Sequence, residues 1–192
     1  MSVSDENKTI AKAALGALGG KPMVRAYWDD NKENYIDMLS CNDRPCDGVT
    51  SYSTIGLSGH SIDQIVEDIP LRAEIVGVCA SSYECFPNIL GSCAFNIINT
   101  KYTCYPGAIF QNIVKYYLPD SPMKHILFLP PFLWEDKLTT LSFKDKKVAW
   151  LLAVPISEKE FEYAKEHGTD ALETLFEEHQ IDIFDLKRNS VK

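Results

Sequence analysis

The stretch VAWLLAVPISEKEFEYAKEHG, residues Val148–Gly168, reads as a buried strand that runs directly into a capped helix. Its apolar half, Val148–Ile156, has the length of a buried strand and falls well short of the ~18 apolar residues that a membrane span needs. Ser157 and Glu160 have the spacing of a capping box, in which each side chain bonds to the backbone amide of the other residue. Gly168 then ends the helix.

The elements on either side complete an α+β pattern. A helix is expected from Ser4, which can cap it, to Leu18, and a last helix is expected after a Thr169 cap, with Leu172, Leu175 and Phe176 as its apolar side. Turn-forming residues separate the strands and favour an antiparallel meander. The remaining elements are expected as strands at 23–28, 35–41, 50–58, 73–81 and 125–129 and a helix at 83–99. The prediction is one α+β domain over residues 1–192, a mostly antiparallel sheet packed with helices.

Negative charge is concentrated near the C-terminal end of the sequence. The net charge is −8, and residues 157–185 contain ten Asp or Glu but only two Lys. Such a segment repels nucleic acid and attracts a basic partner, although a merely solvated helix face would look the same. The helical period turns five carboxylates outward, which we expect to form part of one acidic face: Glu158, Glu162, Glu166, Glu173 and Glu177.

Catalytic and metal-binding motifs are nearly absent. Cys41 and Cys46 flank the turn CNDRPC without a second pair of ligands, so no structural zinc and no other cofactor is expected. The sequence contains no H-E-x-x-H, G-x-S-x-G or phosphate-binding glycine loop. A thiol nucleophile at Cys41 or Cys46, activated by Arg44, is the enzymatic alternative. The acid pair Asp29–Asp30 is expected to end a strand in solvent.

Several segments taken together resemble the suppressor-of-fused-like (SUFU) domain family over essentially the whole sequence. They are YWDD (27–30), SYSTIGLS (51–58), AEIVGVC (73–79), LPPFLWED (129–136), the stretch Val148–Gly168 and IDIFDLKR (181–188). The resemblance implies a binding protein without catalytic residues. It further implies a bacterial antitoxin, or immunity protein, that blocks the C-terminal nuclease domain of a cognate toxin with an N-terminal LXG export region.

These expectations define a partner and a location. No basic region leads into an apolar run at the N-terminus, so a cytoplasmic protein is expected. Direct contact to nucleic acid or membrane is not expected, because the C-terminal segment is acidic and no apolar run is long enough to span a bilayer. The expected toxin-binding residues are the five carboxylates above, with the loop around Trp28, Asp29 and Asp30 as the second choice. A small thiol enzyme or a general peptide-binding scaffold are the alternatives.

Overall fold

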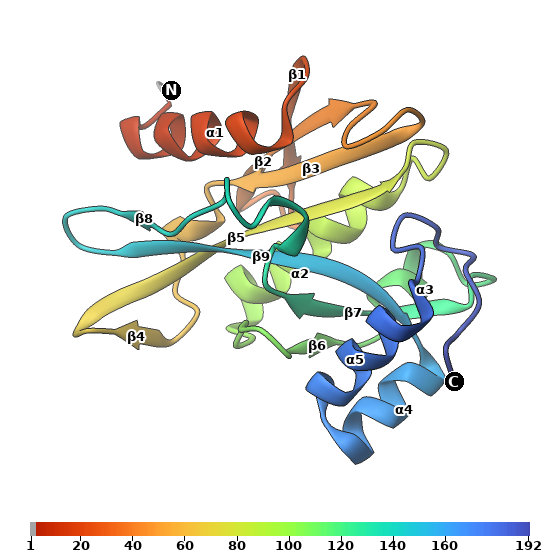
Figure 1. Cartoon of the computed structure of the whole chain (residues 1–192). Helices are drawn as coiled ribbons and strands as arrows, with labels where there is room; N and C mark the ends of the chain where they lie inside the picture. Colours follow the sequence, from red (N-terminus) through yellow and green to blue (C-terminus); the bar gives the residue numbers. More distant parts are fainter. Residues whose placement is uncertain (1–2) are drawn as a thin grey trace.

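The computed structural model describes residues 3–192 and confirms the α+β prediction (Figure 1). One mixed sheet has the strand order β1-β2-β3-β5-β9-β7-β6, with β4 added to β5 and β8 to β9. The strands are β1 (Pro22–Trp28), β2 (Tyr35–Asn42), β3 (Val49–Ile55), β4 (Gln64–Val66), β5 (Ile69–Ala80), β6 (Ile109–Phe110), β7 (Met123–Leu129), β8 (Leu141–Ser142) and β9 (Lys147–Ser157). The helices are α1 (Asp5–Leu18), α2 (Phe86–Thr100), α3 (Ile113–Tyr117), α4 (Glu158–His167) and α5 (Thr169–His179), with 3-10 turns η1 (Leu57–Gly59) and η2 (Phe132–Trp134).

Helices cover both faces of the sheet, which explains the unbroken apolar run of β9. Leu151 and Ala153 pack into a core with α2 and α3, whereas Leu152 and Val154 pack into a second core with α1, α4 and α5. Alternate side chains of a strand point to opposite faces, so a strand buried on both sides must be apolar at every position. Within residues 3–192, no helix combines the length and the apolar character needed to cross a bilayer.

The helix signals in the sequence are largely confirmed. Ser4 accepts the Asn7 amide and caps α1, and both bonds of the Ser157–Glu160 capping box are present. The prediction that Thr169 caps α5 is wrong, because Gly168 occupies the cap position and no side chain bonds there. The helix expected from residue 83 begins at Phe86, with Pro87 in its first turn as its fixed φ favours.

The strand expected at residues 50–58 stops at Ile55 because Gly56 adopts a left-handed φ of 100°. The buried carboxylate of Glu74 fixes the turn that follows. It accepts the Thr54 hydroxyl at 2.6 Å and the Gly56 and Ser58 amides at 3.0 Å each. A further departure from a simple meander is the parallel pairing of β5 with β9, whose register joins Leu71 to Lys147.

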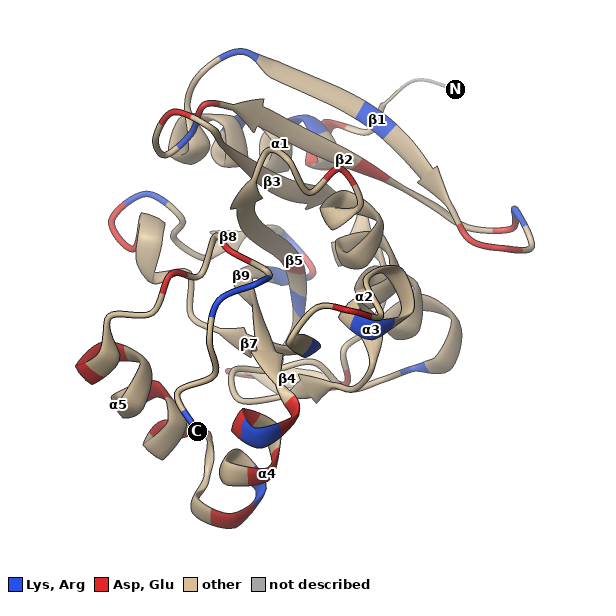
Figure 2. Cartoon of the chain, turned by 90° about the vertical axis from the view of Figure 1, so that its right-hand side faces the viewer, with Lys and Arg blue, Asp and Glu red and all other residues tan. Residues whose placement is uncertain are grey.

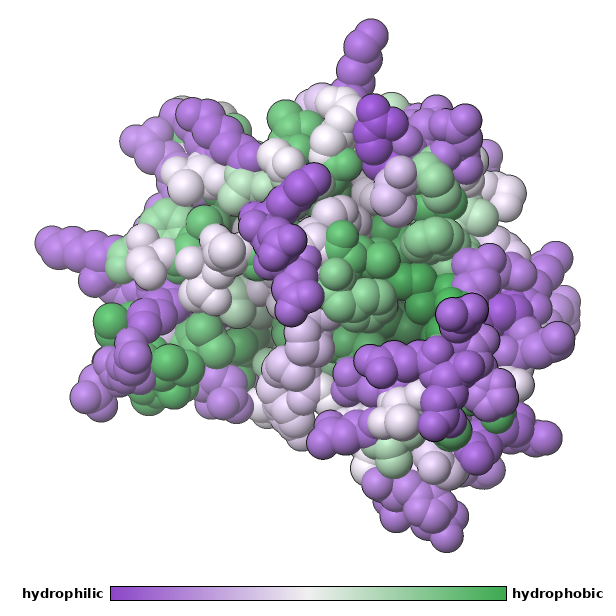
Figure 3. Space-filling view, viewed as in Figure 1, coloured by the Kyte–Doolittle hydropathy of each residue, from purple (hydrophilic) through white to green (hydrophobic). Residues whose placement is uncertain are grey.

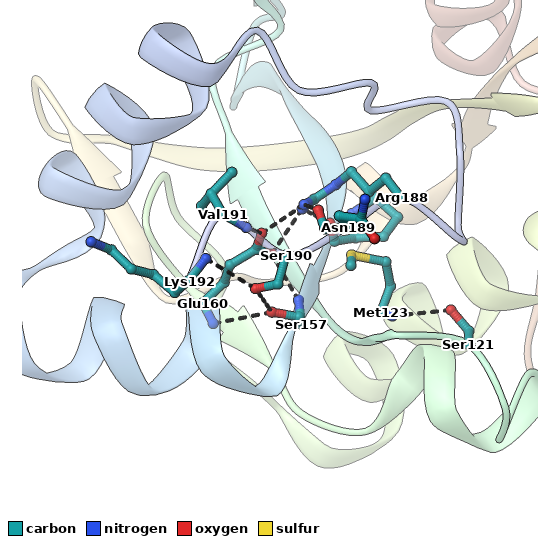
Figure 4. Close-up of polar contacts among 10 residues, drawn as sticks. Ser121, Met123, Ser157, Glu160, Arg188, Asn189, Ser190, Val191 and Lys192 are labelled. Carbon is teal, nitrogen blue, oxygen red and sulfur yellow. Dashed lines mark hydrogen bonds and ion pairs between the residues drawn. The ribbon is translucent and has the colours of Figure 1, made fainter.

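A buried ion pair fastens the C-terminal segment to the start of α4 (Figure 4). Arg188 donates to both oxygens of Glu160, at 2.6 and 2.8 Å, and to the Pro155 carbonyl at 3.0 Å. The same carboxylate accepts the Ser157 amide of the capping box and the Val191 amide. Glu160 is fully buried, and the Arg188 guanidinium also lies 5.4 Å from the Phe176 ring centroid. One carboxylate thus joins β9, α4 and the C-terminal segment.

Replacing Arg188 with Met should lower the free energy of unfolding by about 3–5 kcal/mol, because the Glu160 charge is then buried without its partner. The measurement is urea unfolding followed by circular dichroism. Lys187→Met is the matched control, since Lys187 is exposed next door and should change stability by less than ~0.5 kcal/mol. Equal stabilities of the two variants would contradict a structural role for the ion pair.

Candidate partner-binding surface

Helix α4 carries three exposed carboxylates, but they do not form a purely acidic face. Glu162 and Glu166 are exposed as expected. Lys165 lies between them on the helix surface, with its ammonium over the Phe161 ring, and Lys159 adds a second positive charge. The exposed face of α4 is therefore of mixed sign.

Glu158 is bound to a buried histidine on β7. Its Oε2 lies 3.2 Å from His125 Nε2, while the Asn112 amide donates to His125 Nδ1 at 2.9 Å. Because Nδ1 accepts a hydrogen bond, the ring proton resides on Nε2, and the imidazole is neutral and donates to Glu158. Burial lowers the pKa of His125, and the Glu158 carboxylate offsets that effect only in part.

Helix α5 carries the acidic character of this region, because it contains four carboxylates and no Lys or Arg (Figure 2). Glu177 is exposed, as expected. Glu173, which the helical period turns outward, is only partly exposed, because its side chain lines an apolar groove. Burial and the neighbouring charges of Asp170 and Glu177 raise the pKa of Glu173.

The groove beside α5, here called the α5 groove, has a volume of about 390 Å³. Leu129 and Val154 of the sheet form its floor, η2 lies on one side, and α5 with the segment 180–184 forms the other. Figure 3 shows an apolar hollow bordered by the hydrophilic side chains over α5. The lining consists of Leu129, Pro130, Phe132, Leu133, Val154, Glu173, Phe176, Glu177, Gln180, Ile181, Asp182, Ile183 and Phe184.

Hydrogen bonds from the body of the domain hold the 180–184 wall of the α5 groove in place. The Phe184 carbonyl accepts the Ala80 amide at 2.9 Å, and the Tyr83 hydroxyl donates to Asp185 at 2.6 Å. Three residues later the chain enters the Arg188–Glu160 ion pair. These contacts anchor the C-terminal end of the wall to the body of the domain, and the groove is present in the chain without a partner.

The Trp28–Asp30 segment begins the β1–β2 turn, on the other side of the molecule from α5 (Figure 2). Trp28 is about half exposed and packs on Tyr35 with ring centroids 5.0 Å apart. Asp29 is buried, which contradicts the expectation of a solvated acid pair, whereas Asp30 is exposed. Burial opposes ionisation of Asp29, but hydrogen bonds from Asn34, the Glu33 amide and Asn99 lower its pKa. Both carboxylate oxygens of Asp29 accept hydrogen bonds from within the chain, so Asp29 organises the turn.

The two cysteines that flank the CNDRPC turn, between β2 and β3, have different environments. Cys41 lies on β2 and is fully buried, and burial raises the pKa of its thiol despite the nearby Arg44 guanidinium. Cys46 is exposed in the turn. A raised thiol pKa suppresses the reactive thiolate, so Cys41 is poorly suited to nucleophilic catalysis. Across residues 3–192, no group of three or more His, Cys, Asp or Glu is arranged to hold a metal ion.

Comparison with known sequences gives a consistent result. Residues 32–189 match the family model described as Suppressor of fused protein (SUFU). The chain is also 55% identical over 191 residues to "Immunity protein YqcF" of Bacillus subtilis (strain 168), and the alignment covers 100% of both chains. Identity at this level over the full length means that the two proteins share one fold and one domain arrangement.

Solved structures with little sequence identity show the same fold. A SUFU homolog from Neisseria gonorrhoeae FA 1090 superposes with a TM-score of 0.76 at 18% identity, covering 98% of this chain and 97% of that one. A structure of the Sufu-Fu complex gives 0.69 at 14% identity, with 97% and 92% covered. Drosophila Suppressor of Fused gives 0.56 at 16% identity, and there 82% of this chain matches only 43% of the larger protein.

The difference between the two thiols can be measured with a chromogenic disulfide reagent. Cys46 should react rapidly in the native protein because it is exposed, whereas Cys41 should react only after denaturation. Mass spectrometry of the labelled peptides assigns each site, and Cys46→Ser should remove the rapid phase while Cys41→Ser leaves it intact. Rapid labelling of Cys41 would revive the thiol-nucleophile alternative.

The neutral state of His125 has a consequence for stability at low pH. Its folded pKa lies below the unfolded value of 6.5, so as the pH falls through about 6.5 the unfolded chain takes up the proton first and stability decreases. The free energy of unfolding, measured with urea between pH 7.5 and 5.5, should therefore depend less on pH in His125→Gln than in the unsubstituted protein. The exposed His167→Gln serves as control and should follow the unsubstituted profile; a steeper loss in His125→Gln would refute the assignment.

Proposed function

The chain belongs to the suppressor of fused family, and on that premise we propose that it is an immunity protein that neutralises the C-terminal nuclease domain of a cognate LXG-type toxin in the cytoplasm of a bacterium. The observation that supports this most is the 55% identity, over the whole chain, to a protein named as an immunity protein. The family relationship alone would leave the partner open, because the solved relatives share only the fold.

The charge distribution fits such a partner. A nuclease must attract phosphates, so the surface around its active site is basic. An acidic protein can associate with that surface rapidly and exclude the nucleic acid. The chain has a net charge of −8, and its most acidic exposed helix, α5, lies next to an apolar groove. The proposal requires no catalytic step and no cofactor.

Within this proposal the toxin contacts the side of the molecule formed by α4 and α5. Glu158, Glu162 and Glu166 contribute from α4, and Glu173 and Glu177 contribute from α5. Since the α4 face is mixed in sign, we assign its exposed acids to the rim of the contact, where charges act mainly on association rate. The turn with Trp28, Asp29 and Asp30 is the second candidate surface, supported by the exposed aromatic pair Trp28–Tyr35.

Co-expression tests the function directly. The C-terminal nuclease domain of the cognate toxin should co-purify with this chain as a stable complex, and the purified chain should abolish nuclease activity at a molar ratio near one. RNA and DNA are both supplied as substrates. Absence of both binding and inhibition would overturn the proposed function, whereas binding without inhibition would place the contact outside the nuclease active site.

Reversing two rim charges tests the surface. The variant Glu162→Lys/Glu166→Lys should associate with the toxin domain about tenfold more slowly at low salt, and the deficit should shrink at high salt because rim charges are screened. Stopped-flow association at two ionic strengths is the measurement. Asp5→Lys/Asp145→Lys reverses the same number of exposed charges away from α4 and should slow association much less. Equal rates for the two variants would point to the Trp28 turn instead.

A further inference from the structure

We propose that the α5 groove is the docking site for a toxin segment that presents a large apolar side chain next to Lys or Arg. This inference deepens the proposed function and rests on it. It moves the centre of the contact from the exposed face of α4 to the groove between η2 and α5, and it assigns the energy of binding to an apolar anchor as well as to charge.

The lining of the α5 groove is suited to an apolar anchor. Phe132 is about half exposed at its edge and adjoins the other apolar residues of the lining, so it forms part of a contiguous exposed apolar surface. Ile181, Ile183 and Phe184 form the opposite wall and are also only partly buried. A volume of about 390 Å³ lies near the lower end of the range for ligand sites, roughly 300–1,000 Å³, and matches one or two side chains rather than a whole helix.

The charges around the α5 groove specify a basic partner. The lining includes Glu173, Glu177 and Asp182 but no Lys or Arg. Within residues 3–192, none of these three carboxylates takes part in a salt bridge. Three unneutralised acids on the rim of an apolar surface favour a segment with cations next to its apolar anchor and disfavour an acidic one.

The environment of Glu173 supports the same partner chemistry. Burial and the neighbouring acids Asp170 and Glu177 raise the pKa of its carboxyl group. A cation placed in the groove would oppose both effects, because it supplies an opposite charge where only like charges now lie. Glu173 is therefore better satisfied in a complex with a basic segment than in the free protein.

Rigidity of the α5 groove favours tight binding. Its 180–184 wall is fixed by the Ala80–Phe184 hydrogen bond and by the Arg188–Glu160 pair beyond it, and its floor is the sheet itself. A preformed site has little conformational entropy to lose when it is occupied. A second copy of this chain is a poor occupant, because two molecules of net charge −8 would bring their most acidic helices together.

Binding of the purified toxin domain to groove variants tests the proposal. Phe132→Ala and the double variant Glu173→Gln/Glu177→Gln should each raise the dissociation constant at least about tenfold, as expected for an anchor pocket and its charged rim. Two matched controls should stay within about twofold of the unsubstituted protein. Tyr116→Ala removes another exposed aromatic, and Asp170→Asn/Glu178→Gln removes two charges from α5 outside the groove lining.

A second arm does not depend on the toxin. A synthetic peptide with a central Leu-Phe pair flanked by lysines should shift the amide resonances of Phe132, Glu177 and Ile183, whereas the same peptide with glutamates in place of the lysines should not. Absence of these shifts overturns the inference, as does a toxin complex that tolerates all groove variants.

The two arms separate the possible failures. If the unsubstituted chain does not bind the toxin domain, the proposed function fails, and the peptide arm alone decides whether the α5 groove takes a basic, apolar segment. Sedimentation of the chain alone tests whether a second copy of this chain occupies the α5 groove. A dimer that Phe132→Ala dissociates would assign the α5 groove to self-association and overturn the inference.

Discussion

The buried pair of Glu160 and Arg188 is the constraint on which the C-terminal half of the structure depends. Two charges removed from water are costly unless every oxygen and N–H has a partner, and here the carboxylate accepts four hydrogen bonds. Any other placement of the 188–191 segment would leave Glu160 buried without its cation, which is costly. The direction of α4 and the path of the chain after α5 are thereby fixed together.

That fixed path shapes the surface assigned to the partner. The chain leaves α5, forms one wall of the α5 groove through residues 181–184, and only then reaches Arg188. The groove is thus a by-product of how the C-terminal segment packs against the sheet. Its acidic rim comes from α5, which carries no base, whereas α4 balances its exposed acids with Lys159 and Lys165. This arrangement places apolar surface and negative charge side by side in the α5 groove.

Signals that act over a few residues were readable from the sequence. The capping box at Ser157, the cap at Ser4 and the apolar run Val148–Ile156 of β9 all depend on neighbours in the chain, and the structure has them. Contacts between distant segments were not readable. Glu160 pairs with Arg188, Asp29 accepts a hydrogen bond from Asn99, and Glu173 lines a groove whose other residues include the segment that follows α5. The helical period turned Glu173 toward solvent because the period describes only the helix itself and not the segments that pack beside it. The parallel pairing of β5 with β9 joins strands about seventy residues apart and leaves no local pattern.

The order in which the ribosome synthesises the chain determines when the segment 181–191 can pack. Residues 181–191 are synthesised after every strand and helix against which they pack, so their contacts can form only after the rest of the domain has been made. Until residues 181–191 pack, Glu160 has no cation beside it and the Phe176 ring lacks the Arg188 guanidinium. The apolar floor of the groove is then open on one side. A chain in which residues 181–191 have not yet packed therefore has an open apolar surface and an unpaired Glu160, so the C-terminal segment completes both the core and the groove.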